Sequence, residues 1–407
     1  MDFPGSKMRS VIGLAIGLAL VLASPQSEAA DHHRHSTVAG SDDACTASEL
    51  ACSDKAQPFF DKDGTLWLAW QGGGRIVVAS TRDGVRFSKP VFVTPEVVAA
   101  DVGPEARPQI VRDAAGTLKV VYTVMQETKG YNGRIYLSQS TDGGKTFSPP
   151  VPVTDNPVSQ RFPVLTLKSD GRVFAAWTDK RNARAAKQSY DGAALAFSWL
   201  DGARTAPTTI AQDNICECCR LAVAFDPSDN IAVMWRQVFP GMIRDHAVTT
   251  FVGGKPGPMH RVATDSWHID ACPHHGPALA ITTDGSYHAA WFTDGDARKG
   301  LFYAQSRDTG LTFTAPQPVG NAANNPGHAQ LLAIGAKLWL AWQEFDGVRV
   351  SIQAMKKTAD GWTAPREIAA TDNASDLPIL VARGSEPYLS WLTANEGYRL
   401  ISLEDAP

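Results

Sequence analysis

Short apolar runs that end in an aromatic residue recur along the chain at intervals of roughly 50 to 60 residues. Clear examples are Leu66–Trp70, Val173–Trp177 and Leu338–Trp342, each preceded within a few residues by Gly or Asp. The aromatic residues that end the seven runs are Trp70, Tyr122, Trp177, Trp235, Trp291, Trp342 and Trp391. Short strands repeated at this spacing predict an all-β fold, a β-propeller of four-stranded antiparallel blades.

Each aromatic run is preceded by another short strand and followed by a third. Asp-Gly pairs between the first two strands, as at Asp170-Gly171, indicate tight hairpin turns. We count seven blades, with six as the alternative. The last blade, from Leu377 to about Leu403, contains only three predicted strands. We therefore expect a strand from the segment before Lys55 to complete the last blade and close the ring.

A second motif follows the third strand of several blades. Ser140–Phe147 and Ser306–Phe313 share the pattern Ser-x-Asp-x-Gly-x-Thr-Phe, and Ser80–Phe87 and Thr358–Trp362 are degenerate copies. These runs resemble the Asp-box (BNR) repeat of sialidase-like propellers. In such a turn the Asp side chain accepts hydrogen bonds from backbone amides and Gly takes a positive φ. The resemblance implies a sialidase-like propeller, but the repeat is structural and implies no activity by itself.

Composition changes this picture at the N-terminus. The chain has 407 residues, 43% of them hydrophobic, and a net charge of −4, which does not favour a nucleic-acid partner. Lys7 and Arg9 precede the apolar run 11–23, and small residues follow at Ser27 and Ala29. This pattern predicts a signal peptide over 1–29, a His-rich tail over 30–52 and the propeller over 53–407. The protein is expected to be periplasmic or secreted, where disulfides persist.

The predicted tail contains two further candidate features. Cleavage after Ala29 or after Ala30 leaves His32 or His33 as the third residue, and an N-terminal amine with a third His suits square-planar Cu(II). A polar tail without a ligand is the alternative interpretation. Cys45 and Cys52 are close in sequence and are predicted to form a disulfide clasp.

Four of the six cysteines lie in the runs 215–220 and 271–277. Both runs are expected to open the innermost strands of neighbouring blades and to meet at the mouth of the central channel. The candidate metal ligands are Cys216, Cys218, Cys219, Cys272, His274 and His275. Alternation along a strand would point Cys219 away from its neighbours, so Cys218, Cys272 and His274 are the first choice, completed by Cys216 or His275. Thiolate and imidazole ligands suit copper, which we favour, or zinc.

Other cysteine chemistry remains open. In an oxidising compartment the four central cysteines are expected to form two disulfides if they bind no metal. A vicinal Cys218–Cys219 disulfide, with a thiol-dependent redox activity, is a further alternative. The chain contains no Cys-x-x-Cys-His run, so no haem is expected.

The resemblance also implies an alternative function, that of a sialidase-like glycoside hydrolase (exo-α-sialidase). Sialidases bind a substrate carboxylate with three arginines, and a carboxylate pair would serve glycoside hydrolysis. The candidates for these roles are Arg107, Arg161, Arg220, Asp179 and Asp294. The expected Phe-Arg-Ile-Pro-like opening is missing, as is a convincing Tyr/Glu pair. The last alternative is a binding platform without catalysis. For the protein as a whole, the expected partners are a metal ion or a small anionic ligand at the channel mouth and a periplasmic or membrane protein.

Overall fold

The computed structural model describes residues 49–101, 103, 105–126, 132–182, 192–201 and 207–404, all within the unit Ser36–Pro407. The predicted signal peptide, His32, His33 and Cys45 lie outside the described residues. The regular elements of the described chain are β-strands, apart from two short 3-10 turns, η1 (Leu50–Cys52) and η2 (Ala322–Asn324). None of its helices is long and apolar enough to cross a membrane.

The strands form antiparallel sheets in chain order. The first two sheets contain β1 (Ala56–Phe60), β2 (Leu66–Gly72), β3 (Arg75–Thr81) and β4 (Val91–Phe92), then β5 (Gln109–Arg112), β6 (Leu118–Met125), β7 (Gly133–Ser140) and β8 (Val151–Pro152). A nine-stranded sheet follows, made of β9 (Gln160–Leu167), β10 (Val173–Asp179), β11 (Ala193–Trp199), β12 (Thr209–Ile215), β13 (Ala222–Phe225), β14 (Ile231–Phe239), β15 (Ile243–Val252), β16 (Lys255–Pro256) and β17 (His260–Arg261).

Three further sheets complete the fold. The first of them contains β18 (Ala278–Ile281), β19 (Tyr287–Asp294), β20 (Lys299–Ser306) and β21 (Gln317–Val319). The second contains β22 (Gly327–Ile334), β23 (Lys337–Phe345), β24 (Val350–Thr358), β25 (Gly361–Trp362) and β26 (Arg366–Thr371). The third contains β27 (Ile379–Arg383), β28 (Glu386–Thr393) and β29 (Gly397–Ser402).

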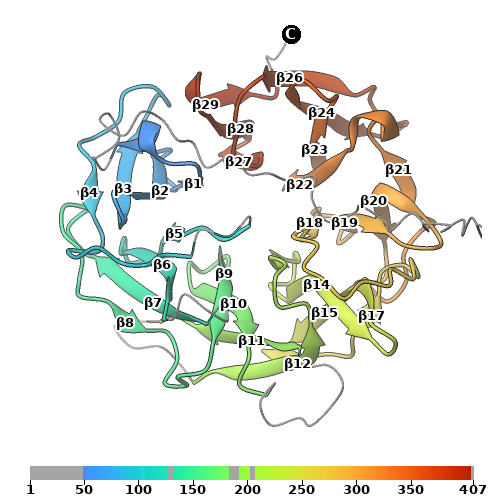
Figure 1. Ribbon diagram of the computed structural model, residues 1–407, viewed down its shortest axis with the longest axis horizontal. Helices are drawn as coiled ribbons and strands as arrows, with labels where there is room; N and C mark the ends of the chain where they lie inside the picture. The colour runs from blue at the N-terminus through green and yellow to red at the C-terminus, as the bar shows by residue number, and fades with distance from the viewer. Residues whose placement is uncertain are drawn as a thin grey trace, which may run out of the picture. The chain divides into compact units, whose positions relative to one another are not determined.

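The innermost strands form a closed ring. Each contacts the next in the order β1, β5, β9, β13, β18, β22 and β27, and β27 contacts β1. Figure 1 shows the sheets arranged around this common centre, which confirms the predicted all-β propeller architecture. The ring contains seven inner strands, one for each predicted blade, whereas the hydrogen-bonded sheets number six within the described ranges. The two counts differ because Ile215 of β12 pairs with Gln237 of β14 and so joins two blades into one sheet.

The second strand of each blade carries most of its core. The seven aromatic residues singled out by the sequence all lie on second strands and are at most 1% exposed. Burial of one such side chain contributes on the order of 3 kcal/mol. Several of the indole N–H groups donate to a polar side chain, as Trp177 does to Asp179 and Trp342 does to Glu344. A Trp fits positions 177 and 342 because its apolar body is buried and its N–H group has an acceptor.

The Asp-box turns have the predicted local geometry. Asp142 accepts backbone N–H bonds from Lys145 and Thr146 at 3.0 Å, and Gly143 and Gly144 both have positive φ. Asp308 accepts the equivalent bond from the backbone N–H of Thr312 at 2.9 Å. Hydrogen bonds from the hydroxyls of Thr312 and Ser306, together with this backbone bond, stabilise the carboxylate form and hold the pKa of Asp308 down, at about 2.

The last sheet has three described strands, as expected. Its outer strand β29 contacts the turn Leu50–Cys52, which lies in the segment expected to close the ring. This part of the segment is a 3-10 turn and not a strand. Cys45 lies outside the described residues, so the Cys45–Cys52 disulfide stays a prediction.

The buried residue His288 gives the fold a testable pH dependence. Its ring nitrogens contact the Tyr303 hydroxyl at 2.7 Å and the Thr282 hydroxyl at 3.1 Å. Burial and, to a smaller extent, the nearby Lys357 lower the pKa of His288 from 6.5 to about 4, against the opposing effect of Asp284. Between these two values the unfolded chain binds a proton that the folded chain does not, so stability falls as pH falls from about 6.5 to 4.

We expect this residue to account for about 3 kcal/mol of the acid-induced loss of unfolding free energy. Urea unfolding of the wild type and of His288→Gln at about pH 7 and about pH 4.5 measures it. The variant should start less stable, because it loses hydrogen bonds, and should then lose less stability on acidification. An identical pH dependence in the two proteins would contradict the prediction.

Candidate metal centre

The cysteine-rich run 216–221 connects β12 to β13, the innermost strand of its blade. The backbone N–H of Cys216 donates to the carbonyl of Arg236 at 2.8 Å, after which the chain leaves the sheet and turns at Glu217 and Cys218. The expected strand-like alternation is therefore wrong for these residues. Because the run is a turn, Cys219 is carried back toward Cys216 and does not point away from it.

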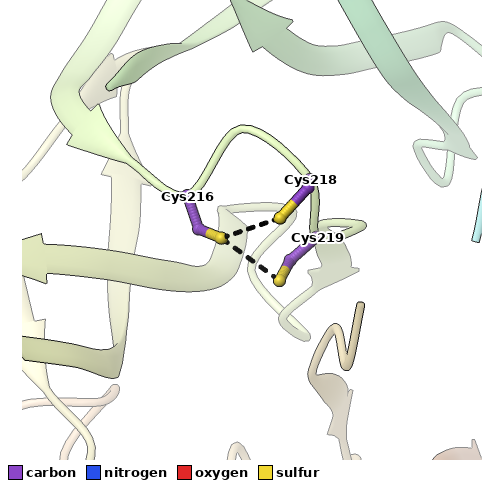
Figure 2. Close-up of side chains that lie close together, drawn as sticks. All are labelled: Cys216, Cys218 and Cys219. Atoms are coloured by element: carbon purple, nitrogen blue, oxygen red, sulfur yellow. Dashed lines mark hydrogen bonds between the residues drawn. The ribbon is translucent and has the colours of Figure 1, made fainter. Parts of the chain in front are cut away.

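Three thiols gather within this turn, as Figure 2 shows. The Sγ atom of Cys216 lies 3.5 Å from that of Cys218 and 3.3 Å from that of Cys219. All three sulfur atoms lie within 4.8 Å of one another, and the three residues are at most 2% exposed. We call Cys216, Cys218 and Cys219 the thiol cluster. Its spacing allows one ion to contact all three sulfur atoms.

Two buried arginines place positive charge beside the thiol cluster. Nη1 of Arg244 lies 3.3 Å from Sγ of Cys216 and donates to it, and Arg236 also acts on this sulfur electrostatically. The hydrogen bonds from the Cys218 and Cys219 thiols, aided by both guanidinium groups, hold the pKa of Cys216 well below its ordinary value.

The other two thiols respond in the opposite direction. Donation to Cys216 raises the pKa of Cys218, and burial raises the pKa of Cys219. These interactions favour the thiolate form at Cys216 over Cys218 and Cys219. The position of Arg244 just after the aromatic strand β14 places it on the same face as Cys216.

The second cysteine-rich run, 271–277, precedes β18 and lies beside the thiol cluster. Nδ1 of His274 lies 3.1 Å from the carbonyl oxygen of Cys218, and His274 itself has a φ of 51°. The His275 ring stacks between Phe292, at 4.2 Å, and His328, at 4.4 Å between ring centroids.

This placement changes the predicted ligand set. Cys272 is exposed at the edge of the cluster, and an interaction with the Cys218 thiol lowers the pKa of Cys272. The first-choice set of Cys218, Cys272 and His274 is not the group that the structure brings together. His274 and His275 lie outside it because one ring is directed to a backbone carbonyl and the other is part of an aromatic stack.

A buried carboxylate bridges the two runs across the ring. Glu105, in the segment before β5, has a side chain that is 0% exposed. It accepts hydrogen bonds from the backbone N–H of Gly276 at 2.9 Å and from the backbone N–H of Arg220 at 3.1 Å. The Arg220 guanidinium lies 3.2 Å from the same carboxylate and also donates to the carbonyl oxygens of Pro277 and Ala329.

Arg236 also contributes hydrogen bonds that hold the run 271–277 in place. It donates to the carbonyl oxygens of Arg244 at 2.9 Å and His275 at 2.9 Å. The positions of both runs are therefore set by charged groups and not by apolar packing alone.

The arginines of the sialidase alternative are each held by a carboxylate of the protein. Arg107 pairs with Asp376 at 2.8 Å, Arg161 pairs with Asp101 at 2.7 Å, and Arg220 pairs with Glu105. A substrate carboxylate would have to compete with these pairs.

The carboxylates proposed for glycoside hydrolysis are engaged as well. Asp179 is fully buried and pairs with Arg181 at 2.7 Å. Asp294 pairs at the surface with Lys299, also at 2.7 Å.

Comparisons with known proteins bear on the fold. The sequence matches no protein-family model, and the search of curated proteins found no match. A PL25 ulvan lyase, described as a polysaccharide lyase, aligns with a TM-score of 0.56 and 10% identity, over 84% of this chain and 90% of the lyase. The polysaccharide lyase Uly1 aligns with a TM-score of 0.54 and 10% identity, over 86% of this chain and 88% of its own. These likenesses show the fold.

A third similar structure is that of the Hadza microbial sialidase Hz136. It aligns with a TM-score of 0.48 and 14% identity, over 84% of this chain and 77% of the sialidase. The likeness to the two polysaccharide lyases is consistent with the β-propeller that the repeated strand pattern predicts.

Proposed function

We propose that the protein binds one soft metal ion, copper(I) in preference to zinc, through Cys216, Cys218 and Cys219. The observation that carries the proposal is the convergence of three buried sulfur atoms within 4.8 Å. Thiolate ligands select copper(I) and zinc among common metal ions. Structural zinc sites are almost always four-coordinate, whereas this cluster offers three ligands, which favours copper(I).

The surrounding charges support the same proposal. Three thiolates around one copper(I) ion carry a net charge of about −2, which must be compensated where water is excluded. Arg244 and Arg236 are 4% and 1% exposed, and both act on Cys216. Two buried guanidinium groups thus match the charge of the proposed complex.

Disulfide formation is the main competitor for these thiols. Cys216, Cys218, Cys219 and Cys272 are free cysteines in this structure. We propose that the protein is exported, as its N-terminal sequence indicates, and that metal binding protects the thiols in the oxidising compartment. The His-bearing N-terminus, with His32 and His33, is proposed as a separate Cu(II) site.

Metal content tests the main proposal. Protein purified from its native compartment should contain about one equivalent of copper or zinc, measured by elemental mass spectrometry. The cluster thiols should become titratable after the metal is removed with a chelator. Protein without metal, and without titratable thiols in the cluster, would contradict metal binding and indicate disulfides in its place.

A carbohydrate-active enzyme is the second candidate. It is favoured by the similarity of the fold to two polysaccharide lyases. Its test is cleavage of ulvan and of a sialoside by the purified protein. Turnover that survives Arg107→Ala and Arg161→Ala would exclude the arginine-based sialidase mechanism.

A further inference from the structure

The metal proposed for the thiol cluster needs a route to reach it. Cys216, Cys218 and Cys219 are at most 2% exposed, so a metal still bound to a donor cannot contact them directly. Two buried arginines border the cluster on the side of Cys216. A ligand that can meet the donor must therefore lie on another side.

Cys272 is the exposed thiol beside the cluster. It is exposed, and so are the preceding residues Asp270 and Ala271. Two residues further on, the ring of His274 lies 3.1 Å from the carbonyl oxygen of Cys218, which fixes this run against the turn of the cluster. The interaction with the Cys218 thiol that lowers the pKa of Cys272 agrees with this placement. Cys218 thus links the exposed run to Cys216, whose sulfur is 3.5 Å from its own.

This arrangement suits a ligand-exchange path better than a permanent metal site with four sulfur ligands. Soft ions move between thiolates by substitution, in which a new metal–sulfur bond forms as an old one breaks. A path of this kind needs one accessible sulfur and a shared neighbour in contact with the final site. Cys272 and Cys218 meet these two requirements.

We infer that Cys272 is the entry and exit ligand of the metal centre, not a permanent member of it. The inference rests on the proposed function. The Cys272 thiolate binds the incoming copper(I) ion as the donor ligand leaves. Cys218 and Cys219 then bind the ion and each releases its proton to water, Cys216 completes the site, and Cys272 dissociates and is reprotonated. Copper stays copper(I) throughout, so no oxidant or reductant is needed.

The path also indicates the kind of partner. A donor or acceptor must present its own soft ligand, a thiolate or a thioether, to an exposed sulfur. Glutathione-bound copper(I) reproduces this chemistry in a simple probe. The sulfonated chelator bathocuproine serves as the acceptor.

The experiment compares the wild type with Cys272→Ser, both loaded with one equivalent of copper(I). We expect Cys272→Ser to bind the same number of copper equivalents as the wild type and to keep its copper at equilibrium. The rates of loading from copper–glutathione and of transfer to bathocuproine should each fall by at least about tenfold, equivalent to about 1.4 kcal/mol in the barrier. Asp270→Asn, an exposed change in the same run, is the matched control and should exchange at the wild-type rate.

Other outcomes separate this inference from the proposed function. A wild type that binds no copper would contradict the proposed function itself. Normal exchange by Cys272→Ser would leave that function intact and overturn the inference, and loss of equilibrium copper from the same variant would make Cys272 a permanent ligand and overturn it too.

Two further measurements guard against a folding artefact. Cys272→Met restores a soft ligand and should recover part of the exchange rate. Alkylation of the loaded wild type with iodoacetamide should modify Cys272 and slow copper transfer without releasing the ion. Fast transfer from the alkylated protein would contradict the inference without any substitution.

Discussion

Cys216→Ser should abolish stoichiometric copper(I) binding while leaving the propeller folded. Cys216 is the sulfur closest to both other members of the thiol cluster, at 3.3 and 3.5 Å, and it accepts the hydrogen bond from Arg244. Serine keeps the size of the side chain but replaces a soft thiolate by a hydroxyl, which copper(I) does not favour. The loss of affinity should exceed the roughly 100-fold that is typical of removing an outer partner of a metal ligand.

Competition with bathocuproine measures this loss, and thermal unfolding of the metal-free proteins reports on the fold. Val233→Ala is the matched control, because Val233 is buried in the same blade but belongs to its hydrophobic core. It should lower the unfolding temperature and still bind one equivalent of copper. Copper binding by Cys216→Ser at the wild-type affinity would exclude the thiol cluster as the site.

The fold could be predicted from the sequence because its determinants are local and repeated. A run such as Val173–Trp177 specifies a buried second strand by itself, and the Asp142 turn forms through bonds within five residues. Repetition of these units at a constant interval then implies a ring. The joining of two blades through Ile215 and Gln237 was not predictable, because it depends on one isolated backbone pairing.

The candidate site could be predicted only in part. The two cysteine-rich runs do precede β13 and β18, as the blade pattern indicates. The first-choice set of Cys218, Cys272 and His274 differs from the group that the structure brings together, because strand alternation was assumed for Cys219, whose backbone is a turn. The orientation of His274 could not be foreseen either, since it depends on a positive φ and on a carbonyl more than fifty residues away in sequence.

Glu105→Gln should destabilise the protein and weaken the metal centre together. The carboxylate is fully buried and is the anionic partner of Arg220, which is 21% exposed. An amide in its place leaves that guanidinium without its counter-charge and sets an NH₂ group against backbone N–H donors. Removal of one partner from a buried pair costs about 3 kcal/mol, so a loss of that order in unfolding free energy is expected.

The metal affinity should fall as well, because Glu105 holds Arg220, which follows the thiol cluster, and Gly276, which follows Cys272 and His274. We expect a loss of about 10- to 100-fold, the range found for groups that orient metal ligands without contacting the metal. The thiolate-to-copper charge-transfer spectrum should shift in Glu105→Gln, since the geometry of the cluster changes.

Glu344→Gln separates this positioning role from a general effect of changing a buried carboxylate. Glu344 is 6% exposed and accepts hydrogen bonds from Trp342, Asn321 and Asn324, away from both cysteine-rich runs. This control should lose stability but keep the wild-type spectrum and copper affinity. If both variants lost stability and neither changed the metal centre, Glu105 would stabilise the fold without positioning the thiol cluster. A spectral shift confined to Glu105→Gln would mean that a residue from a distant blade sets the geometry of the thiols, since Glu105 precedes Arg220 by 115 positions.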